Sequence, residues 1–223
     1  MIHIPAILST DLLAEVNGRI ADSEWVCGRQ TAGHQSALVK NNQQISEDDE
    51  GGVAAAAIIL DVLAKHPIFV SAALPAKISP PLFNQYGIGE AYGNHIDGAI
   101  RPLGSGRMRT DLSGTLFLNQ PDSYEGGELV ITDSRGVHEI KLPAGDLILY
   151  DSGSIHHVAP VRQGSRQASF FWVQSLIRLP DQRAILFDLD TVIQELTSDG
   201  AKKTHILALT AQYHKLLRLW SDM

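Results

Sequence analysis

Residues 128–150, ELVITDSRGVHEIKLPAGDLILY, decide the fold of this 223-residue chain. They contain three β-rich segments, which are Glu128–Thr132, Val137–Leu142 and Leu147–Tyr150. Between them stand Asp133-Ser134-Arg135-Gly136 and Pro143-Ala144-Gly145-Asp146, and both are typical of turns because Asp, Ser, Pro and Gly adopt turn conformations readily. Strands that follow one another this closely, with no helix between them, indicate a sandwich or barrel rather than βαβ units.

The same pattern of short β-rich segments extends from about residue 68 to residue 176. The further candidate strands are Leu82–Tyr86, His95–Asp97, Gly114–Leu118, Ile155–Val161 and Ala168–Leu176. About eight strands in two sheets is the strand count of a jelly roll, an architecture whose mouth often holds a site. We therefore expect a mainly β fold of the α+β class with a double-stranded β-helix (jelly-roll, cupin-like) core.

Helices are expected before this core. Ser9 or Thr10 can cap a helix whose apolar positions fall on one face; these positions are Leu12, Leu13, Val16 and Ile20. The acidic run at 46–50 favours the positive end of a helix dipole, which predicts a helix over about 51–65 that closes at His66-Pro67.

Helices are also expected after the core. Beyond Pro180, residues 181–197 and 204–220 each place apolar side chains on one helical face. We expect this helical pair to pack on the sandwich or on a second subunit, and the second arrangement gives a homodimer. The chain is thus divided into an N-terminal helical support region (1–77), the jelly-roll core (78–178) and a C-terminal helical extension (179–223).

Composition excludes several classes of protein. A net charge of −7 argues against nucleic acid or an anionic membrane surface as the main partner. The longest strongly apolar run, at 53–60, is far too short to span a bilayer, and the N-terminus lacks the pattern of a secretory signal. The single cysteine, Cys27, rules out an internal disulfide and favours a reducing compartment, and we expect it to be a small buried hydrophobe. These features predict a soluble cytoplasmic protein.

A first candidate for chemistry is His95-Ile96-Asp97. In an extended backbone, residues two apart share a face, so His95 and Asp97 could bind one ion. Alone the motif carries little weight, since 9 His and 25 acidic residues predict roughly one such match by chance.

Three further features strengthen the motif. His156 and His157 lie on a β-rich segment, and the alternation of a strand lets only one of them face inward. Arg166 begins a strand whose face is otherwise largely apolar, so it needs an anionic partner, which a bound carboxylate would provide. Gly126-Gly127 is consistent with a tight backbone turn beside a pocket.

Two histidines and one carboxylate on one face of a metal leave three positions open, the arrangement of non-haem Fe(II) oxygenases. Each of these residues taken singly is more often structural, as a hydrogen-bonded strand histidine or a surface arginine. Taken jointly and in this order, they favour a catalytic site.

Several long motifs carry a family resemblance. They are KNNQQ (40–44), LFNQYGIGEAYGNHIDGAIR (82–101), MRTDLSGTLFLN (108–119), YEGGELVI (124–131), KLPAGDLILY (141–150), SIHHVAPV (154–161) and RAILFDLD (183–190). On these motifs the chain resembles the PKHD-type hydroxylases, bacterial Fe(II)/2-oxoglutarate dioxygenases akin to prolyl and lysyl hydroxylases, and in particular their PiuC/YbiX group. The resemblance covers most of the chain.

The resemblance implies a role for each candidate residue. His95, Asp97 and His156 correspond to the iron ligands, Arg166 to the arginine that holds the far carboxylate of 2-oxoglutarate, and Tyr86 to a tyrosine near that co-substrate. The family pattern places the distal ligand first in His-x-Val, which favours His156 over His157.

The implied activity is hydroxylation of an unactivated C–H bond, with release of succinate and CO₂ and with L-ascorbate to restore oxidised iron. The resemblance leaves a small molecule, a peptidyl side chain and a siderophore open as the substrate, and the family's association with iron uptake suggests the last. The alternative is a non-oxygenase cupin-like metal protein or a small-ligand sensor.

The loop at 98–112 offers a further expectation. It carries Arg101, Arg107 and Arg109 close to the proposed iron. These arginines either form a lid that selects an acidic substrate or lie on a merely solvated loop.

Overall fold

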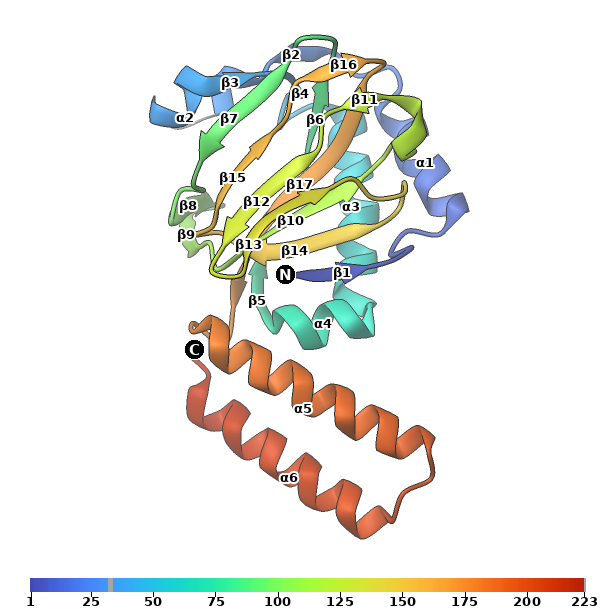
Figure 1. The fold of residues 1–223 in the computed structure, drawn as a ribbon, viewed down its shortest axis with the longest axis vertical. Coiled ribbons are helices and arrows are strands. Elements are labelled where there is room, and N and C mark those ends of the chain that lie inside the picture. The colour runs from blue at the N-terminus through green and yellow to red at the C-terminus, as the bar shows by residue number, and fades with distance from the viewer. Residues whose placement is uncertain (32–33, 223) are drawn as a thin grey trace.

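The protein is a sandwich of two antiparallel sheets with helices on its outside (Figure 1). The computed structural model describes residues 1–31 and 34–222. The larger sheet has the strand order β1-β14-β10-β17-β6-β4-β2, and β5 also pairs with β17. Its strands are β1 (Ile2–Ile4), β2 (Trp25–Cys27), β4 (Gln43–Ile45), β5 (Pro75–Ile78), β6 (Leu82–Tyr86), β10 (Leu112–Phe117), β14 (Leu147–Asp151) and β17 (Arg166–Ser175).

The smaller sheet faces it with the strand order β13-β12-β15-β7-β3. Its strands are β3 (Lys40–Asn41), β7 (Ala91–His95), β12 (Leu129–Asp133), β13 (Gly136–Ile140) and β15 (Ile155–Val158). Two short ribbons complete the β structure: β8 (Ile100–Leu103) with β9 (Gly106–Arg109), and β11 (Glu125–Gly126) with β16 (Val161–Gln163).

The helices lie outside the sandwich. They are α1 (Thr10–Ile20), α2 (His34–Val39), α3 (Glu50–Lys65), α4 (Pro67–Ala73), α5 (Pro180–Ser198) and α6 (Lys203–Trp220). Figure 1 shows α5 and α6 as an antiparallel hairpin that projects away from the sandwich. Among the described residues no single helix is long and apolar enough to cross a membrane, and only the bent pair of α3 and α4 passes that test, by length and composition alone.

The core has two layers, one on each face of the larger sheet. On β14, Leu147 and Leu149 point toward α1 and α3, whereas Ile148 and Tyr150 point toward the smaller sheet. This alternation is the period-two pattern of a strand that is buried on both faces. Each fully buried side chain of this kind contributes about 1.5–3 kcal/mol. The second layer, between the two sheets, is where the candidate site lies.

The two turns in residues 128–150 form as the sequence predicts. β12 and β13 are joined in register from Leu129↔Ile140 to Asp133↔Gly136, and the Asp133 side chain accepts a hydrogen bond from the Arg135 N–H at 2.8 Å. In the second turn, the Asp146 N–H donates to the Pro143 carbonyl at 3.2 Å.

Several predicted strands differ from the structure. His95–Asp97 is not a strand, because β7 begins earlier, at Ala91, and ends at His95. Ile155–Val161 is divided into β15 and β16, since Pro160 has no N–H to continue the ladder. The strand count is also higher than eight, because short strands from the first 78 residues extend both sheets.

The first 77 residues therefore supply strands as well as helices. α1 and α3 occur as expected, with Ser9 and Asp49 as their N-caps. After α3, however, the chain begins a new helix, α4, with Pro67 at its first position. Cys27, expected to be buried, is exposed on β2, an edge strand of the larger sheet.

Candidate metal centre

His95 and His156 face each other across two neighbouring strands of the smaller sheet. They are direct cross-strand partners in the antiparallel pair β7–β15, and their ring centroids lie 4.2 Å apart. Residues directly opposite in such a pair have Cβ atoms about 4.5–5.5 Å apart, close enough for both rings to reach one ion. The pairing register, rather than spacing along one strand, therefore brings the two imidazoles together.

Both imidazoles are oriented in the same way. Nδ1 of His95 donates to the Gly93 carbonyl at 2.9 Å, and Nδ1 of His156 donates to the Ser154 carbonyl at 3.0 Å. A carbonyl only accepts, so in the neutral ring the proton lies on Nδ1 and Nε2 keeps its lone pair. Burial and the neighbouring His156 lower the pKa of His95 to about 4, so this ring is neutral at pH 7. Neutral imidazoles with a fixed Nδ1–H are the form that binds metals.

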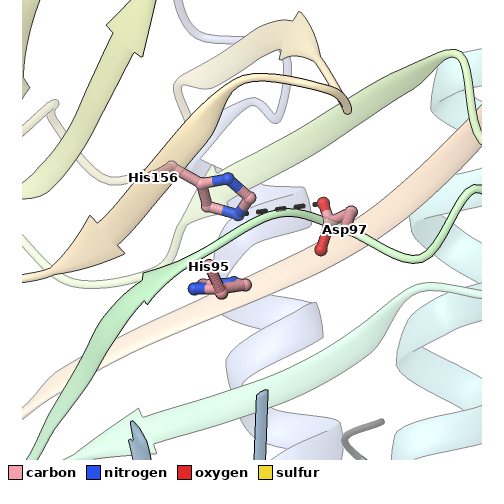
Figure 2. Close-up of side chains that lie close together, drawn as sticks. All are labelled: His95, Asp97 and His156. Atoms are coloured by element: carbon pink, nitrogen blue, oxygen red, sulfur yellow. Dashed lines mark ion pairs between the residues drawn. The ribbon is translucent and has the colours of Figure 1, made fainter. Parts of the chain in front are cut away.

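Asp97 reaches the same place from beyond the end of β7. Its Oδ2 accepts a hydrogen bond of 2.6 Å from Ser113 Oγ on β10, in the larger sheet, and Ser113 also contacts Ser152 Oγ at 2.8 Å. Asp97 Oδ2 lies 3.8 Å from His156 Nε2 (Figure 2). The carboxylate is thus held between the two sheets, directed toward the histidine pair.

The three side chains fit a metal ion. One ligand atom from each of His95, Asp97 and His156 lies within 4.8 Å of the others, and Figure 2 shows the three groups converging. Two imidazoles and one carboxylate form the donor set that mononuclear Fe(II) sites use with positions left open. The donor chemistry and the free Nε2 lone pairs are therefore those that Fe(II) requires.

Arg166 and Tyr86 form a second cross-strand pair, in the larger sheet. They are direct partners in β17–β6, and the Arg166 guanidinium lies 5.4 Å from the ring centroids of Tyr86 and Phe117. Arg166 is only 1% exposed. Burial raises the pKa of Tyr86, so its hydroxyl keeps the proton and can donate it in a hydrogen bond.

The buried Arg166 charge has no anionic partner among the described residues. No carboxylate oxygen of these residues lies within 4.0 Å of it, its Nε has no hydrogen-bond partner, and its Nη1 makes a 3.5 Å contact with Asn84 Oδ1. A buried charge without a partner costs several kcal/mol, roughly, unless a ligand compensates it. Arg166 therefore fits the carboxylate end of a bound acid such as 2-oxoglutarate.

Gly127 leaves the space that Arg166 fills. Its φ is +67°, and a Cβ at this position would lie 3.1 Å from Arg166 Cδ and from the side chains of Tyr124 and Val161. The Gly126-Gly127 turn thus lies beside the site, as the sequence suggests.

A pocket between the sheets contains the metal-ligand candidates. It holds about 760 Å³ of empty space, including the part open to solvent. His95, Asp97, His156 and Tyr86 line it, together with aromatic side chains and two cations, Lys40 and Arg101. Tyr86 and Asn84 line the pocket, and Arg166 lies behind them without lining the pocket itself.

Other residues named from the sequence lie elsewhere. His156 is 4% exposed and lies on the same face of β15 as Val158. His157 points to the opposite face of this strand. Arg107 is exposed, and Arg109 is held in an ion pair with Asp111 Oδ1 at 2.6 Å. Of the three loop arginines, only Arg101 lines the pocket.

Ser113 and Lys40 are functional candidates that the sequence reasoning missed. Ser113 is one of many serines on strands, and nothing in its spacing points to Asp97. Lys40 lies in the KNNQQ motif, but only the pairing of β3 with β7 (Lys40↔Tyr92) brings it to the pocket.

Comparison with known proteins identifies the family. Residues 81–174 match the model of the 2OG-Fe(II) oxygenase superfamily, and residues 181–222 match the PKHD-type hydroxylase C-terminal domain. A PKHD-type hydroxylase of Klebsiella pneumoniae is 54% identical over 224 residues and covers 100% of both chains. One from Burkholderia cenocepacia is 50% identical over 225 residues, covering 100% of this chain and 99% of its own length.

Solved structures share the fold at low sequence identity. A Pseudomonas putida prolyl-4-hydroxylase is 22% identical with a TM-score of 0.53, over 78% of this chain and 91% of its own. A Trichoplax adhaerens prolyl hydroxylase bound to a hypoxia-inducible-factor peptide is 16% identical with a TM-score of 0.56 (78% and 83% covered). HygX from Streptomyces hygroscopicus, with nickel, 2-oxoglutarate and hygromycin B bound, is 11% identical with a TM-score of 0.53 (78% and 82%).

These findings confirm the expected fold, a double-stranded β-helix with flanking helices. Full-length identity of 50–54% to PKHD-type hydroxylases is far above the level at which only a fold is shared. The chain therefore belongs to the family of PKHD-type hydroxylases, and it is an Fe(II)- and 2-oxoglutarate-dependent hydroxylase.

Proposed function

We propose that His95, Asp97 and His156 bind Fe(II), and that the enzyme hydroxylates an unactivated C–H bond of its substrate while 2-oxoglutarate is converted to succinate and CO₂. The observation that carries this proposal is the convergence of the three ligand groups within 4.8 Å, together with a buried Arg166 that has no carboxylate within 4.0 Å among the described residues. A metal trio alone would suit several activities, whereas the guanidinium selects a co-substrate that is an acid.

The three ligands have distinct tasks. The two imidazoles donate Nε2 lone pairs because their Nδ1–H groups are held by backbone carbonyls. Asp97 supplies the negative charge, and Ser113 fixes the direction of its carboxylate. Bound Fe(II) supplies the activation of O₂, and the three protein ligands leave open positions for the co-substrate and O₂.

Arg166 and Tyr86 position the co-substrate. Arg166 would bind the far carboxylate of 2-oxoglutarate in place of its weak contact with Asn84, and the Tyr86 hydroxyl would donate a hydrogen bond. The surrounding side chains, Phe117, Leu129 and Ile131, exclude water, which strengthens each of these polar interactions.

The test is anaerobic addition of Fe(II) and then 2-oxoglutarate to metal-free protein. We expect a visible metal-to-ligand charge-transfer band that is lost in Asp97→Ala and weakened in Arg166→Ala. No band in the wild-type protein at saturating 2-oxoglutarate would refute the proposal.

The prime substrate, the molecule that is hydroxylated, is the remaining part of the proposal. One structural neighbour is bound to a peptide of hypoxia-inducible factor, and another is bound to hygromycin B. Both a peptidyl and a small-molecule substrate therefore suit this fold. Because the family resemblance connects such enzymes with iron uptake, we propose a siderophore or siderophore precursor as the first class to assay.

Two features of the working enzyme are also proposed from the resemblance and the composition. L-Ascorbate would return oxidised iron to Fe(II), so its omission should shorten the linear phase of turnover without changing the initial rate. A cytoplasmic location suits the single unpaired thiol, Cys27, and cell fractionation would test it.

We further propose the division into a support region (1–77), a catalytic core (78–178) and a C-terminal extension (179–223), and a homodimer formed through that extension. The α5–α6 hairpin carries large apolar side chains that are exposed in one chain, such as Leu207 (70%) and Leu219 (74%). A second copy of the hairpin packed against this one would cover these side chains.

A further inference from the structure

We propose that the prime substrate carries a carboxylate, and that Lys40 and Arg101 bind this group in the pocket beside the metal centre. The inference rests on the proposed function, because it takes His95, Asp97 and His156 as the iron site. It adds the chemical class of the substrate and names two specificity residues.

The two cations come from separate parts of the fold. Lys40 lies on β3 and is 5% exposed, and Arg101 lies on β8, in the ribbon that follows the metal-ligand strand. Burial, followed by the nearby Arg101 charge, lowers the pKa of Lys40 to about 8. Folding therefore brings two like charges together at the cost of mutual repulsion, and a bound anion relieves that repulsion.

Arg101 is held in a geometry that suits a carboxylate. Its guanidinium lies 3.7 Å from the ring centroid of Trp172, which fixes the plane of the fork. A stacked guanidinium keeps its N–H edges available for bidentate bonding. Among the described residues no carboxylate lies within 4.0 Å of Arg101, although Asp97 and the exposed Glu47 influence it electrostatically.

The ring of Tyr92 lies between Lys40 and the metal-ligand candidate His95. Lys40 Nζ is 5.3 Å from the ring centroid of Tyr92, and Tyr92 stacks on His95 with centroids 3.6 Å apart. A substrate carboxylate bound by Lys40 and Arg101 would thus be anchored near the iron site, with the remainder of the molecule along the wall formed by Phe170 and Trp172.

Charge balance supports an anionic substrate. With iron and co-substrate bound, the charges of Fe(II), Asp97, 2-oxoglutarate and Arg166 cancel. Lys40 and Arg101 add two further positive charges to the pocket wall. In a partly desolvated pocket such charges favour an anionic ligand and oppose a cationic one.

Arg107 and Arg109, the other two arginines of the β8–β9 ribbon, differ from Arg101 in their surroundings. Arg109 is already paired with Asp111 and Asp222, and Arg107 is exposed and does not line the pocket. From the sequence, the three arginines either form an acidic-substrate lid or lie on a merely solvated loop. Because only Arg101 of the three lines the pocket, we assign substrate binding to Arg101, together with Lys40.

The test uses the anaerobic complex with Fe(II) and saturating 2-oxoglutarate. The probes are the N-acetyl derivatives of the twenty amino acids, each as the free acid and as its carboxamide, with affinity measured by ligand-observed NMR and calorimetry. We expect the best acids to bind about 10- to 100-fold more tightly than their amides, the factor typical of hydrogen bonds to a charged group. Lys40→Met and Arg101→Gln should each remove most of this preference.

Arg107→Ala is the matched control and should keep the preference. The charge-transfer band, recorded for every variant, shows that the metal and co-substrate site remains assembled. If the band is intact but acids bind no better than amides, or if both variants keep the preference, the carboxylate assignment is wrong. Tighter binding of phenyl phosphate than of every acid would also overturn it. Loss of the band in the wild type would instead refute the proposed function.

Discussion

Arg166 is a buried guanidinium that lies near the rings of Tyr86 and Phe117 and makes a long hydrogen bond to Asn84. We predict that Arg166→Met leaves the stability of the ligand-free protein unchanged or raises it by about 1–4 kcal/mol, because an apolar side chain removes a charge that has no partner. The same variant should bind 2-oxoglutarate more weakly, because the far carboxylate loses its cation.

Chemical denaturation and calorimetry would measure both effects. Arg162→Met, at an exposed position on β16, is the control and should change neither quantity. A loss of about 3–5 kcal/mol in Arg166→Met would mean that the guanidinium has a stabilising partner in the free protein, contrary to its surroundings.

The two adjacent histidines are distinguished by the face of β15 that each occupies. His156 points into the pocket and pairs with His95, while His157 points to the other face. We predict that His156→Ala abolishes Fe(II) binding and that His157→Ala leaves it within about threefold, a change below 1 kcal/mol. Metal titration followed by the charge-transfer band would check this, and equal losses in both variants would contradict the assignment.

The lowered pKa of Lys40 predicts a pH dependence of substrate binding. Because this pKa is about 8, the ammonium is largely protonated at pH 7 and largely neutral at pH 9. Besides burial, Arg101, Asp97, Cys27 and the Tyr92 ring act on this ammonium group. Affinity for a carboxylate probe should therefore fall above about pH 8 in the wild type. The fall should be absent in Lys40→Met, and an unchanged fall in that variant would assign it to another group.

At the scale of elements, the β8–β9 ribbon depends on Arg109 for its position. Arg109 donates to Asp111 at 2.6 and 3.0 Å and to the Ser175 carbonyl at 3.2 Å, and it pairs with Asp222. We predict that Arg109→Ala costs about 1.5–3 kcal/mol, the value for hydrogen bonds to a charged group.

The same variant should make the ribbon a preferred site of proteolysis, while the charge-transfer band stays intact. Limited proteolysis with mass spectrometry and urea denaturation would measure the two effects. Cleavage at the ribbon that is no faster than in Arg107→Ala would show that Arg109 does not hold it.

The elements themselves were predictable where local signals decide them. Three kinds of local signal predict elements whose ends agree with the structure to within about two residues. They are the turn residues at 133–136 and 143–146, the Ser9 and Asp49 caps, and the apolar faces of α1, α3, α5 and α6. Strands such as β1 and β4 were missed because three residues gain strand structure only by pairing with β14 or β6, far along the chain.

The candidate site was likewise predictable in its local features and not in those that depend on long-range pairing. The types of its residues could be read from the sequence, but the reason for their convergence could not. His95 and Asp97 do not share a strand face; instead the β7–β15 register brings His156 to His95, and Ser113 of the other sheet holds Asp97. The buried state of Arg166 and the approach of Lys40 to Arg101 also follow from long-range pairing.

At the scale of the whole molecule, the α5–α6 hairpin projects from the sandwich and is tied to it at its base (Figure 1). A small cluster around Ile177 and Leu186 packs against Tyr213 and Trp220, and the Asp222 N–H donates to the Leu176 carbonyl at 2.8 Å. If the hairpin forms the proposed dimer, Leu207→Glu with Leu219→Glu should halve the mass found by sedimentation. A wild-type monomer at micromolar concentration would refute the dimer.

The exposed thiol of Cys27 gives this molecule a built-in attachment point. The next residue, Gly28, donates its N–H to the Asn42 carbonyl, two residues from Lys40, and Cys27 itself acts electrostatically on Lys40. An environment-sensitive fluorophore coupled to this one sulfur would therefore lie at a single known place, near the part of the pocket that Lys40 lines. Its emission could follow pocket filling by untested compounds, so the search for the natural substrate need not wait for a turnover assay.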